Sequence, residues 1–176
     1  IRSQNIEINQ SKLSYHSNLP EKQNGLDFNH FVLRNFNIHA RQLNADSGKV
    51  RVNLKKLSFV DKSGFHLLDL QSRVRLNRKK IALNDLAVRT PDSYLQTDSI
   101  ILFHNQYQGF SHPFNQLRFH LKIKDSNLGT DDLAYFSDQF ANLSKQNFAL
   151  SGQMKGRIGN LKGDSVYLRI GKQSEL

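Results

Sequence analysis

The chain has 176 residues, a formal net charge of +10, twelve Phe, one Met, no Cys and no Trp. This length fits one domain, and a chain of this size buries roughly 70% of the surface that it exposes when unfolded. The apolar share of 38% and the aromatic share of 10% argue against disorder. The lack of cysteine excludes a disulfide scaffold, a cysteine-based zinc site and a thiol nucleophile.

The first residues, Ile1-Arg2-Ser3-Gln4, contain no initiator Met, no apolar signal core and no transit pattern. We therefore expect the chain to be an internal fragment or a processed product of a longer protein, with residues 1–176 forming a single segment. No stretch of the sequence approaches the roughly 18 to 20 apolar residues of a membrane-spanning helix.

Alternation of apolar and polar residues dominates the chain. It covers residues 6–8, 13–15, 50–54, 81–83, 117–123 and 166–170. A period of two is typical of strands with one buried face and one wet face. Short polar breaks that favour turns separate these segments, at residues 45–48, 61–64, 77–80 and 125–129. Breaks this short indicate an antiparallel meander, so the sequence predicts a mainly β fold.

One segment departs from this alternation. Thr130 precedes two acidic residues, and apolar side chains then recur at Leu133, Phe136 and Phe140. An N-cap hydroxyl, acidic residues in the first turn and one apolar stripe predict a short amphipathic helix over 131–140. We expect this helix to complete the core or to cap an open part of the sheet. The stretch 19–25 is expected to be a loop.

Positive charge is concentrated in the first half of the chain. Residues 1–90 hold 16 Lys and Arg against 7 Asp and Glu. One interpretation is attraction to anionic headgroups or a membrane surface, for which the candidate residues are Lys55, Lys56, Arg78, Lys79 and Lys80. The other is a solvated outer face, because Arg51, Arg73 and Arg75 fall at outward strand positions. No recognition helix or aromatic run supports nucleic-acid binding.

The sequence contains no recognisable catalytic or metal-binding motif. His104 and His112 flank the aromatic loop 107–110, but no H-x-x-x-H spacing completes a metal site. We interpret Asp131 and Asp132 as helix-start residues and not as a catalytic pair. The sequence contains no G-x-S-x-G elbow, P-loop or G-x-G-x-x-G motif. We expect no enzyme activity, no metal and no cofactor.

Five segments carry motifs in a fixed order. Residues 26–38 begin with L-D-F-N-H, residues 57–65 contain L-S-F-x-x-x-S-G-F, and residues 86–95 contain a T-P-x-S-x-L step. Residues 133–136 and 150–161 follow, the latter with L-S-G-x-M-x-G-x-I-x-N-L. This ordered set resembles TamB-type proteins of the AsmA-like superfamily, the translocation and assembly module or bridge-like lipid transfer proteins, in their Bacteroidetes-type form. The resemblance covers residues 26–161.

The resemblance implies a large periplasmic protein of a Gram-negative bacterium, anchored in the inner membrane. Its sheet would be a curved "β-taco" with an apolar groove, which carries phospholipid to the outer membrane. It would also support outer-membrane protein assembly and secretion beside a TamA-like barrel partner. Alternation together with the resemblance assigns eight residues to the groove: Val50, Val52, Leu54, Ile81, Leu83, Phe119, Leu121 and Ile123.

Two alternatives stay open from the sequence. The same apolar residues suit a closed core without any ligand. A β-rich scaffold module could also bind a protein partner through free sheet edges, with no lipid. His30, in the first motif, is expected to make a structural hydrogen bond and not to bind a ligand.

Overall fold

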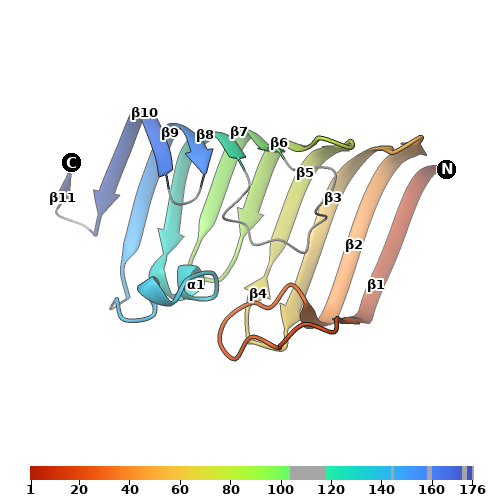
Figure 1. Cartoon of the computed structure of the whole chain (residues 1–176), viewed down its shortest axis with the longest axis horizontal. Helices are drawn as coiled ribbons and strands as arrows, with labels where there is room; N and C mark the ends of the chain where they lie inside the picture. The colour runs from red at the N-terminus through yellow and green to blue at the C-terminus, as the bar shows by residue number, and fades with distance from the viewer. Residues whose placement is uncertain (104–117, 144, 158–159, 172–173, 176) are drawn as a thin grey trace.

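The computed structural model describes residues 1–103, 118–143, 145–157, 160–171 and 174–175, which form one antiparallel sheet (Figure 1). Its strands are β1 (Arg2–His16), β2 (His30–Asp46), β3 (Lys49–Asp61), β4 (His66–Leu67), β5 (Asp69–Leu76), β6 (Lys80–Arg89), β7 (Tyr94–Phe103), β8 (Arg118–Gly129), β9 (Asn147–Arg157), β10 (Asn160–Ile170) and β11 (Ser174–Glu175). They pair in chain order, except that β4 pairs with β3 beside the main path. The sheet is not closed, and the expected mainly β, antiparallel fold is confirmed.

The predicted turns agree with the structure in three places and disagree in one. Chain reversals occur within 45–48, 61–64 and 77–80, as expected. The predicted break at 125–129 is wrong, because β8 continues through it to Gly129. A register shift between Ile123 and Ser126 absorbs these polar residues as a bulge. Asp, Ser, Asn and Gly suit bulges and turns alike, and here the pairing with β9 selects the bulge.

The expected helix near 131–140 is present as two short pieces, α1 (Thr130–Ala134) and the 3-10 turn η3 (Asp138–Phe140). Its start differs from the prediction, because Gly129 is the N-cap and no side chain caps the helix. The Thr130 hydroxyl instead accepts a hydrogen bond from the Gln146 N–H at 3.1 Å. Thr130 therefore ties the helical segment to the chain that leads into β9.

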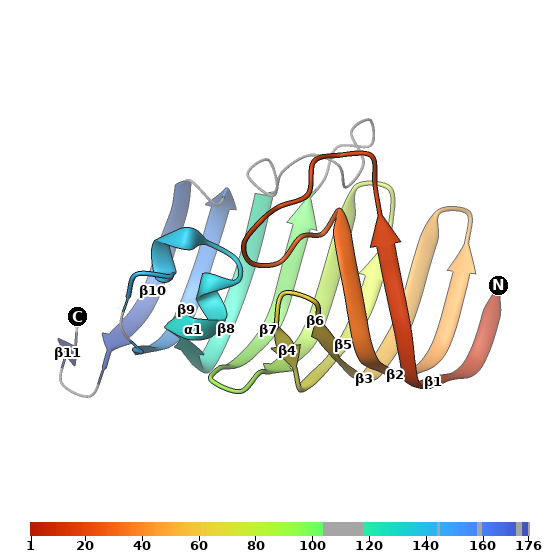
Figure 2. The same cartoon turned by 90° about the horizontal axis from the view of Figure 1, so that it is seen from below.

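A line of β-bulges, which we call the crease, crosses the sheet near the middle of its strands. Register shifts occur in six of the described strand pairs, from β1–β2 to β9–β10. Non-glycine residues with positive φ lie on this line: Gln10, Asn35, Gln42, Asp85 and Ser165. A bulge bends its strand, and Figure 2 shows β1 and β2 sharply bent. The crease divides the sheet into two limbs.

The first limb carries the hairpin turns 46–49 and 77–80, which form the first rim (upper edge in Figure 1). The second limb carries the loop 17–29, the turn 62–65, the turn 90–93 and the segment 130–146, which form the second rim (lower edge in Figure 1).

The inner side of the crease is lined by small, hydroxyl and two larger apolar side chains. The buried residues there are Ala40, Ser72, Leu86, Thr97, Ile123 and Ser126. The Ser72 hydroxyl donates to the Asn84 carbonyl at 3.1 Å, and the Ser126 hydroxyl accepts from the Gln96 N–H at 3.0 Å. Bulges release backbone groups from the ladder, and buried backbone groups need partners. Short hydroxyl side chains supply those partners without filling the bend.

Gly152 gives a test of the crease. It has φ +122°, and a Cβ there would lie 2.4 Å from the Ser165 carbonyl oxygen on β10. We expect Gly152→Ala to lower the free energy of unfolding by about 2–4 kcal/mol, measured by urea denaturation. Gly171→Ala is the control, because Gly171 also has positive φ (+66°) but no atom within 4 Å of such a Cβ. Equal losses in the two variants would contradict the steric role of Gly152.

Candidate functional site

Cross-strand pairing lines up the apolar residues of the first limb. One row runs directly from strand to strand through Val52, Val74, Leu83, Ile100, Leu121 and Met154. It crosses six adjacent strands, a span of roughly 24 Å at the usual strand spacing. A second row, nearer the first rim, runs through Val50, Leu76, Ile81 and Leu102 to the backbone position of Phe119. Together the two rows make a continuous apolar strip, which we call the inner strip.

The side chains of the inner strip are half-buried, not buried. This holds for all of them whose burial is described. Across the described residues, the main contacts between elements join neighbouring strands, and no second sheet packs on the first limb. The buried apolar residues are few: Ala40, Phe65, Leu67, Ala82, Leu86 and Ile123. An antiparallel sheet with an apolar face ordinarily buries it against another layer, and among the described residues no such layer covers the inner strip.

The structure brings the predicted groove residues together on one face. Five of them lie in the inner strip with described side chains: Val50, Val52, Ile81, Leu83 and Leu121. Leu54 and Ile123 lie beside the crease, where Leu54 pairs with Ala40 and Ile123 pairs with Thr97. The Phe119 backbone pairs with Leu102, and its side chain lies outside the described residues.

Sequence reasoning missed five members of the strip: Val74, Leu76, Ile100, Leu102 and Met154. The alternation of Leu70, Ser72, Val74 and Leu76 could have identified the first two. Ile100 and Leu102 belong to an unbroken run of apolar residues, in which alternation cannot assign a side chain to either face. Met154 is identified only by its pairing with Leu121.

The outer face of the same strands is charged and exposed. Arg51, Lys55, Arg73 and Arg75 are all exposed there, as the alternation predicts. Near the crease the cations are paired: Arg73 with Asp85, and both Lys122 and Lys124 with Asp98. Hydrogen bonds from Lys124 and Lys122 hold the pKa of the Asp98 carboxyl below its ordinary value. These exposed pairs contribute little to stability but neutralise the outer side of the bend.

The second rim is held together by the carboxylate of Asp132. Its Oδ2 accepts hydrogen bonds from the Thr90 hydroxyl at 2.5 Å, the Ser93 hydroxyl at 2.6 Å and the Asp92 N–H at 3.2 Å. The T-P-x-S step therefore serves to fasten the turn 90–93 to α1. Asp132 is buried, and its three donors all belong to the turn 90–93.

An aromatic cluster joins the other parts of the second rim. The Phe65 ring is buried and meets the rings of Tyr135 and Phe136 edge-on, at centroid distances of 5.4 and 5.5 Å. The Leu26 N–H donates to the Tyr135 carbonyl at 2.8 Å. Gly25 has φ +72°, and a Cβ there would lie 2.4 Å from the same carbonyl oxygen. The loop 17–29, the turn 62–65 and α1 thus form one connected unit.

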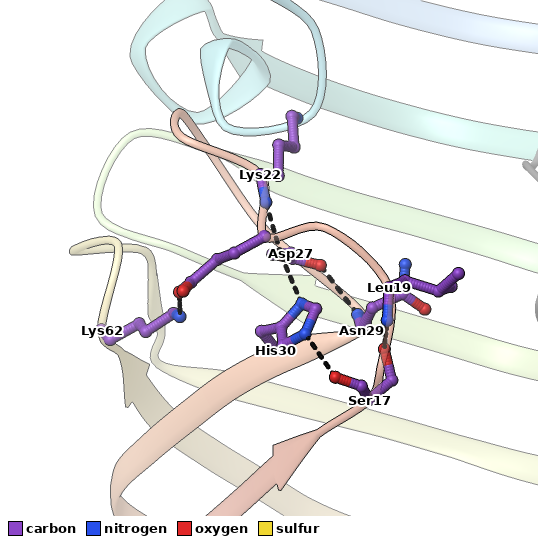
Figure 3. Close-up of polar contacts among 8 residues, drawn as sticks. Ser17, Leu19, Lys22, Asp27, Asn29, His30 and Lys62 are labelled. Atoms are coloured by element: carbon purple, nitrogen blue, oxygen red, sulfur yellow. Dashed lines mark hydrogen bonds and ion pairs between the residues drawn. The ribbon is translucent and has the colours of Figure 1, made fainter.

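His30 anchors the loop 17–29 to β2 (Figure 3). Its Nδ1 lies 3.1 Å from Asp27 Oδ2, and its Nε2 lies 2.8 Å from the Ser17 carbonyl oxygen. Both partners are oxygen acceptors, which match the N–H groups of an imidazole ring. Asp27 also accepts from the N–H groups of Lys22 and Asn29, each at 2.8 Å. The ion pair of Lys62 with Glu21 ties this loop to the neighbouring turn. These contacts give His30 the structural role that the sequence suggests.

Neither metal nor membrane-spanning features are found in the described part of the chain. No group of three or more His, Asp or Glu residues there is placed to hold a metal ion. No described helix has the length and apolar character that crossing a membrane requires. His104, His112 and the aromatic loop 107–110 lie outside the described residues.

Comparisons with known proteins identify no relative: no family model, no curated protein and no solved structure matches this chain.

The contacts of Asp27 predict an acid-sensitive second rim. Burial on its own raises the pKa of Asp27, but hydrogen bonds from the Lys22 and Asn29 N–H groups and from His30 outweigh it and hold the pKa below its ordinary 3.8. A depressed carboxyl pKa contributes stability above the unfolded value, and this is lost as pH falls through the folded value. We expect urea denaturation of the wild type to show this loss below about pH 3.8.

Asp27→Asn should be less stable at pH 7 by about 1–3 kcal/mol and should show a flatter decline in acid. The control, Asp125→Asn, alters an exposed carboxyl and should keep the wild-type pH profile. If the acid decline of Asp27→Asn equals that of the wild type, Asp27 has no such role.

Proposed function

We propose that this chain is a segment of a lipid conduit, in which the inner strip binds phospholipid acyl chains. The observation that carries the proposal is the row of six half-buried apolar side chains that crosses six strands, over which the described residues place no covering layer. Acyl chains are long, flexible and wholly apolar, so they suit a surface that is continuous and has no polar group to match. The charged outer face of the same strands gives the segment a side that faces water.

The free energy of binding grows with the length of acyl chain that lies on the strip. Burying one methylene group contributes about 0.8 kcal/mol, so each part of an acyl chain on the strip adds to its retention. The members of the row are similar in size and polarity from β3 to β8, which gives a chain many sites of comparable affinity and no single deep one. A surface of this kind supports movement of the lipid across the strands, parallel to the crease.

The resemblance of residues 26–161 to TamB-type proteins adds to this proposal. An open, creased antiparallel sheet agrees with the groove that the resemblance implies. We extend the proposal accordingly: the parent protein is anchored in the inner membrane, spans the periplasm and moves phospholipid toward the outer membrane. It also supports assembly of outer-membrane proteins beside a TamA-like barrel.

A second candidate function is a scaffold that pairs with a strand of a protein partner. It is favoured by β1, an outer strand of 15 residues that pairs with β2 alone in the described sheet. Exposed edges of this kind accept an added strand through their backbone groups. Lipid binding distinguishes the two functions, because the scaffold needs none.

Photo-crosslinking tests the conduit directly. A photoreactive residue replacing Val52, Leu83 or Leu121 should crosslink to phospholipid in cells that express the full-length parent protein. The same residue at Arg51 or Lys122 is the control, since these side chains are exposed on the outer face. Mass spectrometry of the crosslinked products gives the readout. Equal crosslinking at both sets of positions, or none at either, would reject the conduit.

A matched pair of substitutions separates lipid binding from folding. Ile100 lies in the inner strip, whereas Ile101 lies on the opposite face between Ala82 and His120. Both isoleucines are half-buried. We expect Ile100→Arg to lower the retained phospholipid by about tenfold or more, because an acyl chain there must desolvate a cation. Ile101→Arg should retain lipid at the wild-type level. The reverse order, or equal loss with intact folding, would contradict the assignment of the strip.

A further inference from the structure

The two rims of the sheet differ in charge. The first rim, formed by the turns 46–49 and 77–80, carries four cations and one carboxylate, Asp46; the cations are Lys49, Arg78, Lys79 and Lys80. The second rim carries more carboxylates than cations among its described residues. Its carboxylates are Glu21, Asp27, Asp92, Asp131 and Asp132, and its cations are Lys22, Lys62 and Lys145.

Local contacts hold the cations of the first rim close together. The Asn77 side chain accepts hydrogen bonds from the N–H groups of Lys79 and Lys80, at 2.9 and 3.0 Å, and so fixes the turn that presents both lysines. The Arg78 side chain lies against the other turn, because a Cβ on Gly48 would be 3.1 Å from its Nε. The two turns are therefore neighbours, and their cations form one patch.

The cations of this patch are not neutralised by the protein. Within the described residues, none of the four forms an ion pair, although Arg73, Lys122 and Lys124 near the crease all do. Just behind the patch, Arg51 and Arg75 stand directly opposite each other on β3 and β5. Like charges at opposed positions destabilise a sheet. An external anion at the first rim would relieve this repulsion.

The patch also adjoins the inner strip. Lys49 precedes Val50, and Lys80 precedes Ile81, so each cation is one residue, about 3.4 Å of strand, from the apolar row, but its side chain leaves the strand on the outer face. Because both lysines stand at the end of a strand, their long side chains reach a headgroup at the open rim and not within the strip. An amphiphile whose acyl chains lie on the strip must leave its headgroup at a rim, where water reaches it. Of the two rims, the first is complementary to a negative headgroup, and the second is not.

We propose that the first rim binds the headgroup of an anionic phospholipid, in which no ammonium group offsets the phosphate charge, so that the groove selects anionic over zwitterionic lipids. This inference rests on the proposed function, because the acyl chains that deliver the headgroup lie on the inner strip. Lys49, Lys79 and Lys80 supply most of the positive charge. Arg78 adds one further positive charge, and its side chain packs one turn against the other.

The test compares two triple variants that remove the same charge. Lys49→Gln/Lys79→Gln/Lys80→Gln alters the first rim. The control, Lys12→Gln/Arg34→Gln/Arg89→Gln, removes three exposed cations from the second limb. Each protein is incubated with vesicles that contain equal amounts of phosphatidylglycerol and phosphatidylethanolamine with identical acyl chains. The protein is then re-isolated, and mass spectrometry gives its total lipid and its headgroup ratio. Circular dichroism confirms that each variant is folded.

We expect the wild type and the control to be enriched in phosphatidylglycerol. The rim variant should return to the vesicle ratio, with total lipid unchanged within about twofold. Its binding to phosphatidylglycerol vesicles should fall on the order of a hundredfold at low salt. No enrichment in the wild type, or equal loss of enrichment in both variants, overturns the inference and leaves the proposed function intact. Absence of lipid from every protein, the wild type included, overturns both.

Two further probes identify the source of the anion. Inorganic phosphate and a single-stranded oligonucleotide are each titrated against the wild type and the rim variant. Weak or rim-independent binding of both supports a lipid headgroup as the ligand. Binding of either probe as tightly as phosphatidylglycerol vesicles, and with the same dependence on the rim, overturns the headgroup assignment.

Discussion

The bend along the crease is the constraint on which the rest of the structure depends. Neighbouring strands in a sheet are joined by hydrogen bonds along their length. One strand therefore cannot bend sharply unless its neighbours bend or bulge at the same level. The chain meets this demand with positive-φ residues such as Gln10, Asp85 and Ser165, and with Gly152 where β9 lies between two bulges. Buried hydroxyls of Ser72 and Ser126 then satisfy the backbone groups that the bulges release.

Local pattern predicted the faces of the sheet well and its bend poorly. Alternation around Val52 and Leu121 is a property of a few neighbouring residues, so their common face could be inferred without a structure. The crease depends on which strands pair and in what register, and Asp-Ser-Asn before Gly129 was open to a turn or a bulge until that pairing was known. The hydrogen bond between Thr130 and Gln146 also joins residues that are 16 positions apart, and helix-capping rules consider only residues within about one turn.

Whether a cation is paired with a carboxylate also depends on its place relative to the crease. Identical residue types have different environments in the two parts of the first limb. Lys122 and Lys124 share Asp98 near the crease, whereas Lys79 and Lys80 at the rim form no ion pair within the described residues. Composition alone gives only the sum of these charges, which is why the sequence left both a solvated face and attraction to an anionic surface open. The positions of the acidic residues show which cations are paired.

The second rim also has a mechanical consequence. Hydrogen bonds and aromatic contacts there connect residue 26 to residue 135 and residue 90 to residue 132, so they brace strands that are far apart in the sheet. The described turns of the first rim join only adjacent strands. Among the described residues, contacts between non-neighbouring strands therefore brace the second rim and not the first. We expect the first limb to yield to bending about the crease before the second limb does.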